Sequence, residues 1–222
     1  MVGAFFSNFL EEFLCKKGNE IMNKKKRIRT RDITIIGMLG AVATVLMLFE
    51  IPLPFAPSFY EIDFSEVPIL VGCFALGPLA GVLIELVKII LNLVINGTVT
   101  AGVGEFANFV IGIAFCVPAA IIYRHKKSKK SAMLGLIVGT IIMAALGCFM
   151  NAYLLLPTYA KAFQMPIDGL IAMGTAVNAN IDSLMSFVML AVLPFNLLKG
   201  ILDSIIVLLI YKKISPILKK QY

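Results

Sequence analysis

The chain contains several apolar stretches long enough to cross a lipid bilayer, and clusters of lysine and arginine separate them. A helix needs about 20 apolar residues to cross a hydrocarbon core about 30 Å thick. Clear candidates cover residues 33–51, 105–123, 132–156 and 184–211. Of the 222 residues, 59% are hydrophobic and 15% are charged, which is too apolar for a water-exposed surface. We therefore predict an all-α integral membrane protein, located in the cell (cytoplasmic) membrane as a multi-pass protein.

The basic residues indicate the orientation of these helices. Most of the 20 lysines and arginines fall in three blocks, at residues 16–31, 124–130 and 212–220. Each block flanks an apolar stretch, which is typical of cytoplasmic segments under the positive-inside rule. The net charge of +7 therefore reflects the orientation of the helices in the membrane. The lipid bilayer is the expected partner, and no nucleic acid is expected.

The apolar run at residues 67–95 needs a break, because as one helix it would be about 44 Å long. Gly77 and Pro78 interrupt it, and proline cannot continue a helical hydrogen-bond ladder. A split there also gives an even number of spans between the first and second basic blocks, as two cytoplasmic blocks require. The prediction is a six-transmembrane-helix bundle at residues 33–215 with both termini cytoplasmic. Its second helix, at about residues 64–76, is short for a span.

The two ends of the chain differ in composition from the predicted membrane domain. Residues 1–21 form an amphipathic run that is too short to span and lacks the basic start and cleavage site of a signal peptide. Translation that begins at Met22 would make this run an over-extended reading frame, and a helix lying on the membrane surface is the alternative. Residues 22–32 are expected to be a basic cytoplasmic prelude, and residues 216–222 a basic cytoplasmic tail.

Sequence motifs of enzymes are missing. The chain has no GxxxxGK[ST] loop, no HExxH zinc motif and no GxSxG nucleophile motif, and its four cysteines and single histidine lack metal-ligand spacing. We therefore expect no enzyme, no metal and no resident cofactor. Any transport would need an ion gradient or an external motor.

Polar side chains within the spans carry the functional signal, because they are costly in hydrocarbon and by default mark function. Glu85, Lys88 and Asn92 lie on one helical face. The first two can neutralise each other as a pair, which leaves Asn92 best able to face a ligand. Asn108 lies on the next helix, where a single amide is more often an interhelical hydrogen bond.

The later helices carry a second polar group toward the predicted outer side. Asn196, Lys199 and Asp203 share one face of the last helix. Either Lys199 pairs with Asp203, or Asn196 and Lys199 line a pocket at the outer end. Asn151 and Tyr153 lie near the outer end of the preceding helix.

Residues 52–64 form an outside connector that is apolar, aromatic and stiffened by three prolines. A solvated connector would be polar, so we interpret this segment as a lid that folds over a ligand. Aromatic faces with a few convergent amides suit a flat heteroaromatic ligand with a polar edge. An aromatic belt at the membrane interface is the alternative.

The first helix has two pairs of small residues that permit close helix approach. Gly37 pairs with Ala41, and Gly40 pairs with Thr44 beside them. Packing within the bundle and docking of a partner helix both fit this spacing.

Taken together, these segments make the chain resemble a known family, the substrate-binding S components of energy-coupling factor (ECF) type vitamin importers. Within that family it resembles the riboflavin-specific S component. The likeness covers nearly all of residues 30–215. The matching stretches are FEIPLPFAPSFYEIDFSEVP at 49–68, FALGPLAG at 74–81, Ala107-Asn108-Phe109, NAYLLLP at 151–157 and PFNLLKG at 194–200.

The resemblance implies a riboflavin-binding subunit that captures the vitamin outside. Loop contacts would fall on Phe59 and Tyr60, amide contacts on Asn151 and Asn196, and a cationic contact on Lys199. The full set of candidate ligand-binding residues is Phe59, Tyr60, Asp63, Asn92, Asn108, Asn151, Tyr153, Asn196 and Lys199.

The resemblance also implies partners. The small residues of the first helix match the motif by which S components dock on a membrane-embedded T component, which two cytoplasmic ATPase subunits drive. The candidate docking residues are Gly37, Gly40 and Ala41. An S component for another vitamin and a stand-alone gradient-driven carrier remain alternative functions.

Overall fold

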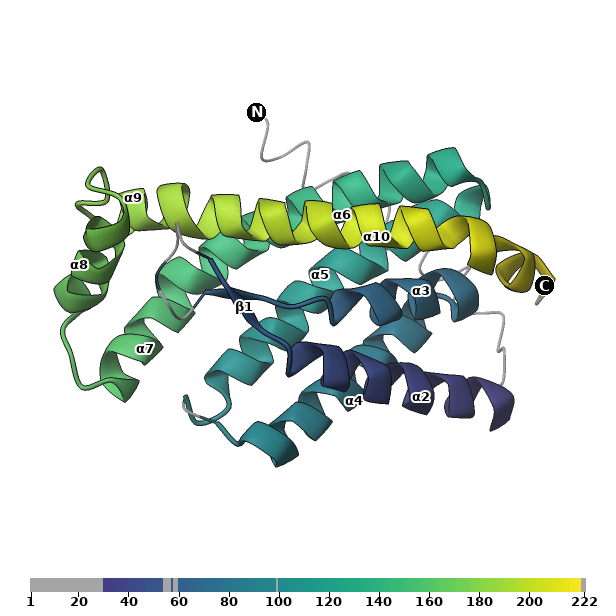
Figure 1. The fold of residues 1–222 in the computed structure, drawn as a ribbon, viewed down its shortest axis with the longest axis horizontal. Coiled ribbons are helices and arrows are strands. Elements are labelled where there is room, and N and C mark those ends of the chain that lie inside the picture. The colour runs from purple at the N-terminus through teal and green to yellow at the C-terminus, as the bar shows by residue number, and fades with distance from the viewer. Residues whose placement is uncertain (1–29, 54–56, 58–59, 99, 221–222) are drawn as a thin grey trace. The chain divides into compact units, whose positions relative to one another are not determined.

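The computed structural model describes residues 30–53, 57, 60–98 and 100–220 (Figure 1). The chain divides into two compact units, Met1–Ile33 and Thr34–Tyr222. The described elements of the larger unit carry the site discussed below. The expectations for residues 1–21 lie outside the described residues.

Helices make up most of the described chain. They are α2 (Thr30–Met47), α3 (Glu66–Leu76), α4 (Pro78–Asn96), α5 (Val103–His125), α6 (Lys129–Met150), α7 (Leu156–Ala162), α8 (Ile167–Val177), α9 (Leu184–Phe187) and α10 (Leu193–Lys220), with the π-helical turns η1 (Asn151–Leu155) and η2 (Val188–Val192). Two short strands, β1 (Ile51–Pro52) and β2 (Glu61–Ile62), pair antiparallel with Ile51 opposite Ile62. This small hairpin closes the ends of the connector that the sequence marks as aromatic.

Five helical stretches in the described residues are long and apolar enough to cross a membrane. They are Thr30–Met47, Pro78–Asn96, Val103–His125, Lys129–Ala162 and Leu184–Ile210. The prediction of a mostly helical protein with several spans is thus confirmed. The 11-residue helix α3 is too short to span by itself.

The predicted break at Gly77 and Pro78 is confirmed. Gly77 has φ 110°, a conformation that a side chain strongly disfavours. Pro78 then begins α4, where its missing N–H leaves no hydrogen bond unmade. A Cβ atom on Gly77 would lie 2.8 Å from a guanidinium nitrogen of Arg124, so this turn packs beside the end of α5.

The connections of the larger unit gather at opposite ends of its long helices (Figure 1). The α3–α4 turn, the basic α5–α6 connection and the end of α10 lie at one end. The β1–β2 hairpin, the α4–α5 connection and the α7–α9 segment lie at the other. This alternation agrees with the division into basic and non-basic connections that the sequence predicts.

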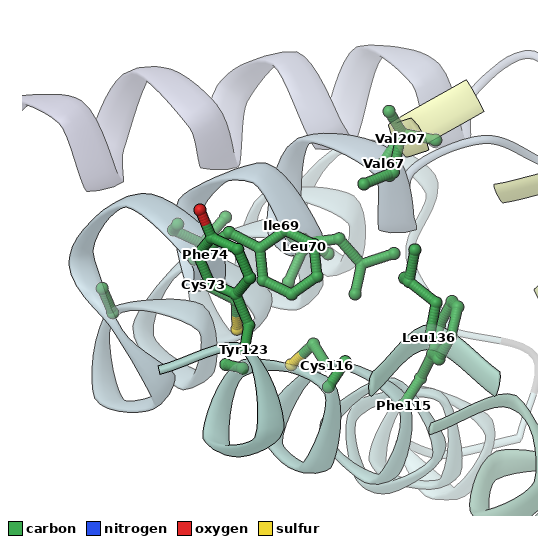
Figure 2. Close-up of a cluster of buried hydrophobic side chains, with 14 of the residues drawn as sticks. Val67, Ile69, Leu70, Cys73, Phe74, Phe115, Cys116, Tyr123, Leu136 and Val207 are labelled. Atoms are coloured by element: carbon green, nitrogen blue, oxygen red, sulfur yellow. The ribbon is translucent and has the colours of Figure 1, made fainter. Parts of the chain in front are cut away.

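The main core lies between α2, α3, α4, α5, α6 and α10, and Figure 2 shows part of it. Phe115 and Tyr123 of α5 are fully buried there. A Cβ atom on Gly139 would lie 2.5 Å from the Phe115 carbonyl oxygen, so the glycine lets α6 approach α5 closely. Small residues at such crossings are characteristic of membrane helix packing. A second apolar cluster gathers around Tyr60 at the hairpin end.

Candidate functional site

The candidate site forms where the aromatic connector meets the end of α6 and the start of α10. Tyr60 is buried, and its hydroxyl donates a 2.6 Å hydrogen bond to Asn151 Oδ1. Its ring centroid lies 5.1 Å from that of Phe195 and 6.2 Å from that of Phe187. The structure therefore brings together two residues that the sequence singled out on separate segments.

The two asparagines are both buried and each bonds back along its own helix. Asn151 Nδ2 donates to the Gly147 carbonyl at 2.8 Å, and Asn196 Nδ2 donates to the Val192 carbonyl at 2.9 Å. Asn151 opens the π-helical turn η1, and Val192 ends η2. Such turns rotate side chains away from the regular helical positions and are frequent at functional sites.

Gly147 is a residue of this site that the sequence reasoning missed. A Cβ atom on Gly147 would lie 2.9 Å from both Asn196 Oδ1 and Nδ2. The glycine thus provides the space that the Asn196 amide occupies between α6 and α10. Its spacing of four residues before Asn151 is the only signal that the sequence offered.

Lys199 and Asp63 form an ion pair between α10 and the connector. Lys199 Nζ lies 2.8 Å from Asp63 Oδ2, and the two side chains are only 12% and 6% exposed. The other oxygen of Asp63 accepts a 2.8 Å hydrogen bond from the Ser65 backbone N–H. Burial alone would raise the pKa of Asp63, but the charges of Lys199 and Lys88 hold that pKa well below its usual value. The carboxylate is therefore charged at neutral pH.

The ion-pair partner of Lys199 is one that neither interpretation of the sequence named. The structure pairs Lys199 with Asp63. Asp203 is fully buried, and its carboxylate oxygens have no hydrogen-bond partner within the part of the chain that the structure describes. The helix-face pattern alone could not find Asp63, which lies 136 residues away in sequence.

A second buried charge cluster surrounds Lys88. Its Nζ lies 2.7 Å from Glu85 Oε1 and 2.8 Å from Glu66 Oε1. Asn108 Oδ1 and Ser65 Oγ each lie 3.4 Å from the same nitrogen. The predicted Glu85–Lys88 pair is confirmed, and Glu66 of α3 is an additional partner. Asn108 thus belongs to the Lys88 cluster.

The remaining candidate residues lie elsewhere. Asn92 is buried and accepts a 2.9 Å hydrogen bond from Asn96 Nδ2. Tyr153 is 72% exposed, and its ring packs 4.9 Å from that of Phe149. The structure therefore does not bring Tyr153 together with Asn151 and Tyr60. Phe59 lies outside the described residues.

Glu50, which lies just before the connector, interacts with Glu61 of the connector. Desolvation, a hydrogen bond with Glu61 and the charges of Glu61 and Asp63 raise the pKa of Glu50 to about 7.

The small residues of α2 divide between two faces. Among the residues that the structure describes, and apart from the surrounding turns of α2 itself, no atom lies within 4 Å of a Cβ atom built on Gly37, and Ala41 is exposed on the same side. A Cβ on Gly40 would lie 2.5 Å from Val87 Cγ1. Gly40 therefore packs against α4 within the bundle, which is one of the two roles that the spacing of the small residues allows.

The chemistry that this arrangement permits is recognition. Aromatic rings, two amides and a buried ammonium group can hold a planar ligand with a polar edge. Among the residues that the structure describes, no cluster of three or more histidine, cysteine, aspartate or glutamate side chains could hold a metal ion.

Comparison with known proteins identifies the family. The family described as "ECF transporter, substrate-specific component" matches residues 31–211. The chain belongs to this family. The riboflavin transporter RibU of Staphylococcus aureus (strain TCH60) is 37% identical to this S component over 202 residues, which cover 90% of the chain and 100% of that protein. The riboflavin transporter FmnP of Bacillus subtilis (strain 168) is 34% identical over 195 residues, which cover 87% and 97%.

A solved structure agrees with this assignment. The structure described as "Structure and mechanism of the S component of a bacterial ECF transporter" is similar to this S component with a TM-score of 0.67 and 35% sequence identity. The similarity covers 85% of this chain and 98% of that one. The predictions of a multi-pass membrane protein and of membership in the S-component family are confirmed.

Proposed function

We propose that this S component binds riboflavin at the site formed by Tyr60, Asn151, Asn196 and Lys199 and mediates its uptake. The observation that carries the proposal is the convergence of the connector, α6 with η1, and α10 on one aromatic and amide cluster. The two relatives named riboflavin transporters, which align over nearly their whole length, support the choice of ligand.

The chemistry of the side chains fits a flavin. The isoalloxazine ring is flat and apolar on its faces, and its pyrimidinedione edge carries alternating donors and acceptors. Tyr60 and Phe195 offer aromatic faces, whereas the amides of Asn151 and Asn196 offer both donors and acceptors. Lys199 offers a charged donor for a carbonyl or ribityl oxygen. On binding, hydrogen bonds to the ligand would replace internal hydrogen bonds such as the one between Tyr60 and Asn151.

The proposal includes membrane and cytoplasmic partners. The face of α2 that bears Gly37 and Ala41 also exposes Met38, Val42 and Val45, which makes a flat apolar surface with space for another helix. We propose that a T component docks there and that two cytoplasmic ATPase subunits supply the energy. No ATPase motif occurs in the chain itself.

The proposed topology has six spans with both termini in the cytoplasm. The chain runs extended from β2 to α3 (Figure 1), and an extended segment gains about 3.3 Å per residue against about 1.5 Å in a helix. This extended segment supports α3 as the second crossing despite its 11 residues. The outer ligand site would then lie at the hairpin end of the larger unit.

Titration of the purified full-length protein with riboflavin tests the ligand. Binding should quench the flavin fluorescence, and the titration should give a dissociation constant below about 1 μM. A dissociation constant of 1 μM corresponds to a binding free energy of about −8.2 kcal/mol. Thiamine, pantothenate and biotin should not compete with riboflavin. Competition by flavin mononucleotide would show that the site tolerates a change at the ribityl end of the ligand. Absence of binding below micromolar concentrations would refute riboflavin as ligand, and competition by another vitamin would identify the other specificity.

A variant and its matched control test the site. Lys199→Met should weaken riboflavin binding by about tenfold or more, because a hydrogen bond to a charged group contributes about 1.5–3 kcal/mol. Lys161→Met changes an exposed lysine outside the site and should leave affinity unchanged. Equal affinities for both variants would exclude Lys199 from the site.

Uptake into liposomes that contain this protein alone would instead indicate a stand-alone carrier.

A further inference from the structure

The Lys88 cluster lies outside the proposed ligand contacts, yet all three of its titratable side chains are buried. Lys88 and Glu85 are 0% exposed, and Glu66 is 2% exposed. A buried charge is expensive unless it is paired and hydrogen-bonded. Two carboxylates surround one ammonium group here, so the cluster has a structural task that justifies this cost.

The position of Glu66 indicates what that task is. Glu66 begins α3, and the short segment 63–66 joins this helix to the aromatic connector. Lys199 of α10 binds Asp63 at one end of the segment, and Lys88 of α4 binds Glu66 at the other. Between them, Ser65 donates its backbone N–H to Asp63. Ammonium groups from two helices thus fix one short segment from both sides.

We propose that Lys88 and Glu66 are positioning residues for the ligand site. Their ion pair fixes the start of α3 against α4, and the connector that carries Tyr60 and Asp63 leaves from this fixed point. Neither residue needs to touch the ligand. This inference rests on the proposed function, because riboflavin affinity is its readout.

The two carboxylates around Lys88 differ in what they connect. Glu85 lies one turn before Lys88 on the same helix, so its ion pair joins α4 only to itself. Glu66 lies 22 residues away on α3, so its ion pair joins two elements. Loss of the Glu66 charge releases the segment, whereas loss of the Glu85 charge leaves the Lys88–Glu66 bond in place.

The size of the effect follows from the population of the competent connector. Affinity falls in proportion to the fraction of molecules that hold the binding conformation. A charge-assisted hydrogen bond lost from the anchor lowers this fraction by about tenfold, which corresponds to about 1.4 kcal/mol. The ligand contacts themselves remain unchanged, so the loss should appear mainly in a slower apparent association of riboflavin.

The test compares Glu66→Gln with the matched control Glu85→Gln in the full-length protein. Both replace one buried carboxyl group beside Lys88 by an amide and keep the side-chain shape. Riboflavin titration should give an affinity about tenfold weaker for Glu66→Gln and within about twofold of wild type for Glu85→Gln, and stopped-flow association should show the same difference in the apparent on-rate. The melting temperature of the ligand-free proteins controls for general destabilisation, and folded protein is isolated by gel filtration before each titration.

A second comparison uses charge-retaining variants that disturb folding less. Glu66→Asp keeps the charge but shortens its reach to Lys88, and Glu85→Asp is its control. The affinity of Glu66→Asp should again be the weaker of the two. A Lys88→Arg variant, which can still bind Glu66, should retain more affinity than Lys88→Met.

The outcomes separate this inference from the proposed function. If the wild-type protein does not bind riboflavin, the proposed function fails. If the wild type binds and the Glu66 variants bind as tightly as the Glu85 variants, the positioning role is overturned. Equal loss of affinity in both pairs also overturns it, because the cluster then serves stability alone.

Discussion

The ion pair between Asp63 and Lys199 makes a quantitative prediction about stability. Lys199→Met removes the ammonium group and leaves the Asp63 carboxylate, whose side chain is 6% exposed, without its charge partner. Removal of one member of a buried ion pair typically costs about 3–5 kcal/mol, because the remaining charge stays desolvated. Asp63 still accepts the Ser65 N–H bond, which lowers the cost. We expect a loss of about 3 kcal/mol for Lys199→Met in the ligand-free protein.

The double variant decides whether the pair causes this loss. Asp63→Asn together with Lys199→Met leaves neither charge buried, so its free energy of unfolding should exceed that of Lys199→Met alone. The interaction free energy between two contacting groups usually lies at about 0.5–3 kcal/mol. Reversible unfolding in mixed micelles of dodecyl maltoside and sodium dodecyl sulfate measures all four proteins of the cycle. Additive effects of the two substitutions would refute the pairing.

The pH dependence of the same pair has a definite sign. The folded-state pKa of Asp63 lies below its ordinary value of 3.8. The pair therefore contributes its full stability above that ordinary value and loses it as the pH falls through the lower folded-state pKa. Between pH 6 and pH 8 the contribution of Asp63 should be constant, and a strong dependence in this range would have to come from another group.

Two further predictions concern α2 and the hairpin. Gly37→Leu should leave riboflavin binding intact and abolish uptake by the assembled transporter, whereas Gly40→Leu should lower the melting temperature because its side chain would collide with Val87; loss of binding in Gly37→Leu would contradict the docking role. The pKa of Glu50 is raised from 4.5 to about 7, so the folded state loses stability as the pH rises between these values. The melting temperature should be lower at pH 8 than at pH 6 by about 1–3 °C, and Glu50→Gln should remove this difference, which thermal unfolding at both pH values checks.

Some features of this S component were readable from the sequence because they depend on residues close together in the chain. The apolar stretches specify membrane helices, since a span depends on local composition and length. The break at Gly77 and Pro78 follows from the backbone chemistry of those two residues. The Glu85–Lys88 pair follows from their spacing of three on one helix.

The sequence also left choices that local rules could not make. Gly37 and Gly40 belong to equivalent pairs of small residues, and the rotation of α2 against α4 determines that only Gly40 is packed. Asn151 and Tyr153 are close in sequence, yet Asn151 is buried against Tyr60 whereas Tyr153 is 72% exposed. Which of these residues is buried depends on the orientation of each helix relative to its neighbours, and the sequence of a single helix does not specify that orientation.

The sequence by itself determined that this protein is a membrane-embedded helical bundle with candidate ligand residues on separate helices. The tertiary structure alone decided which of these residues meet. Tyr60 reaches Asn151 across 91 positions, and Lys199 binds Asp63 across 136 positions in place of the nearby Asp203. Lys88 adds Glu66 of another helix to its local partner. The physical reason is that a buried charge or amide takes whichever partner the packed fold places within hydrogen-bond distance, and sequence spacing fixes that distance only within one helix.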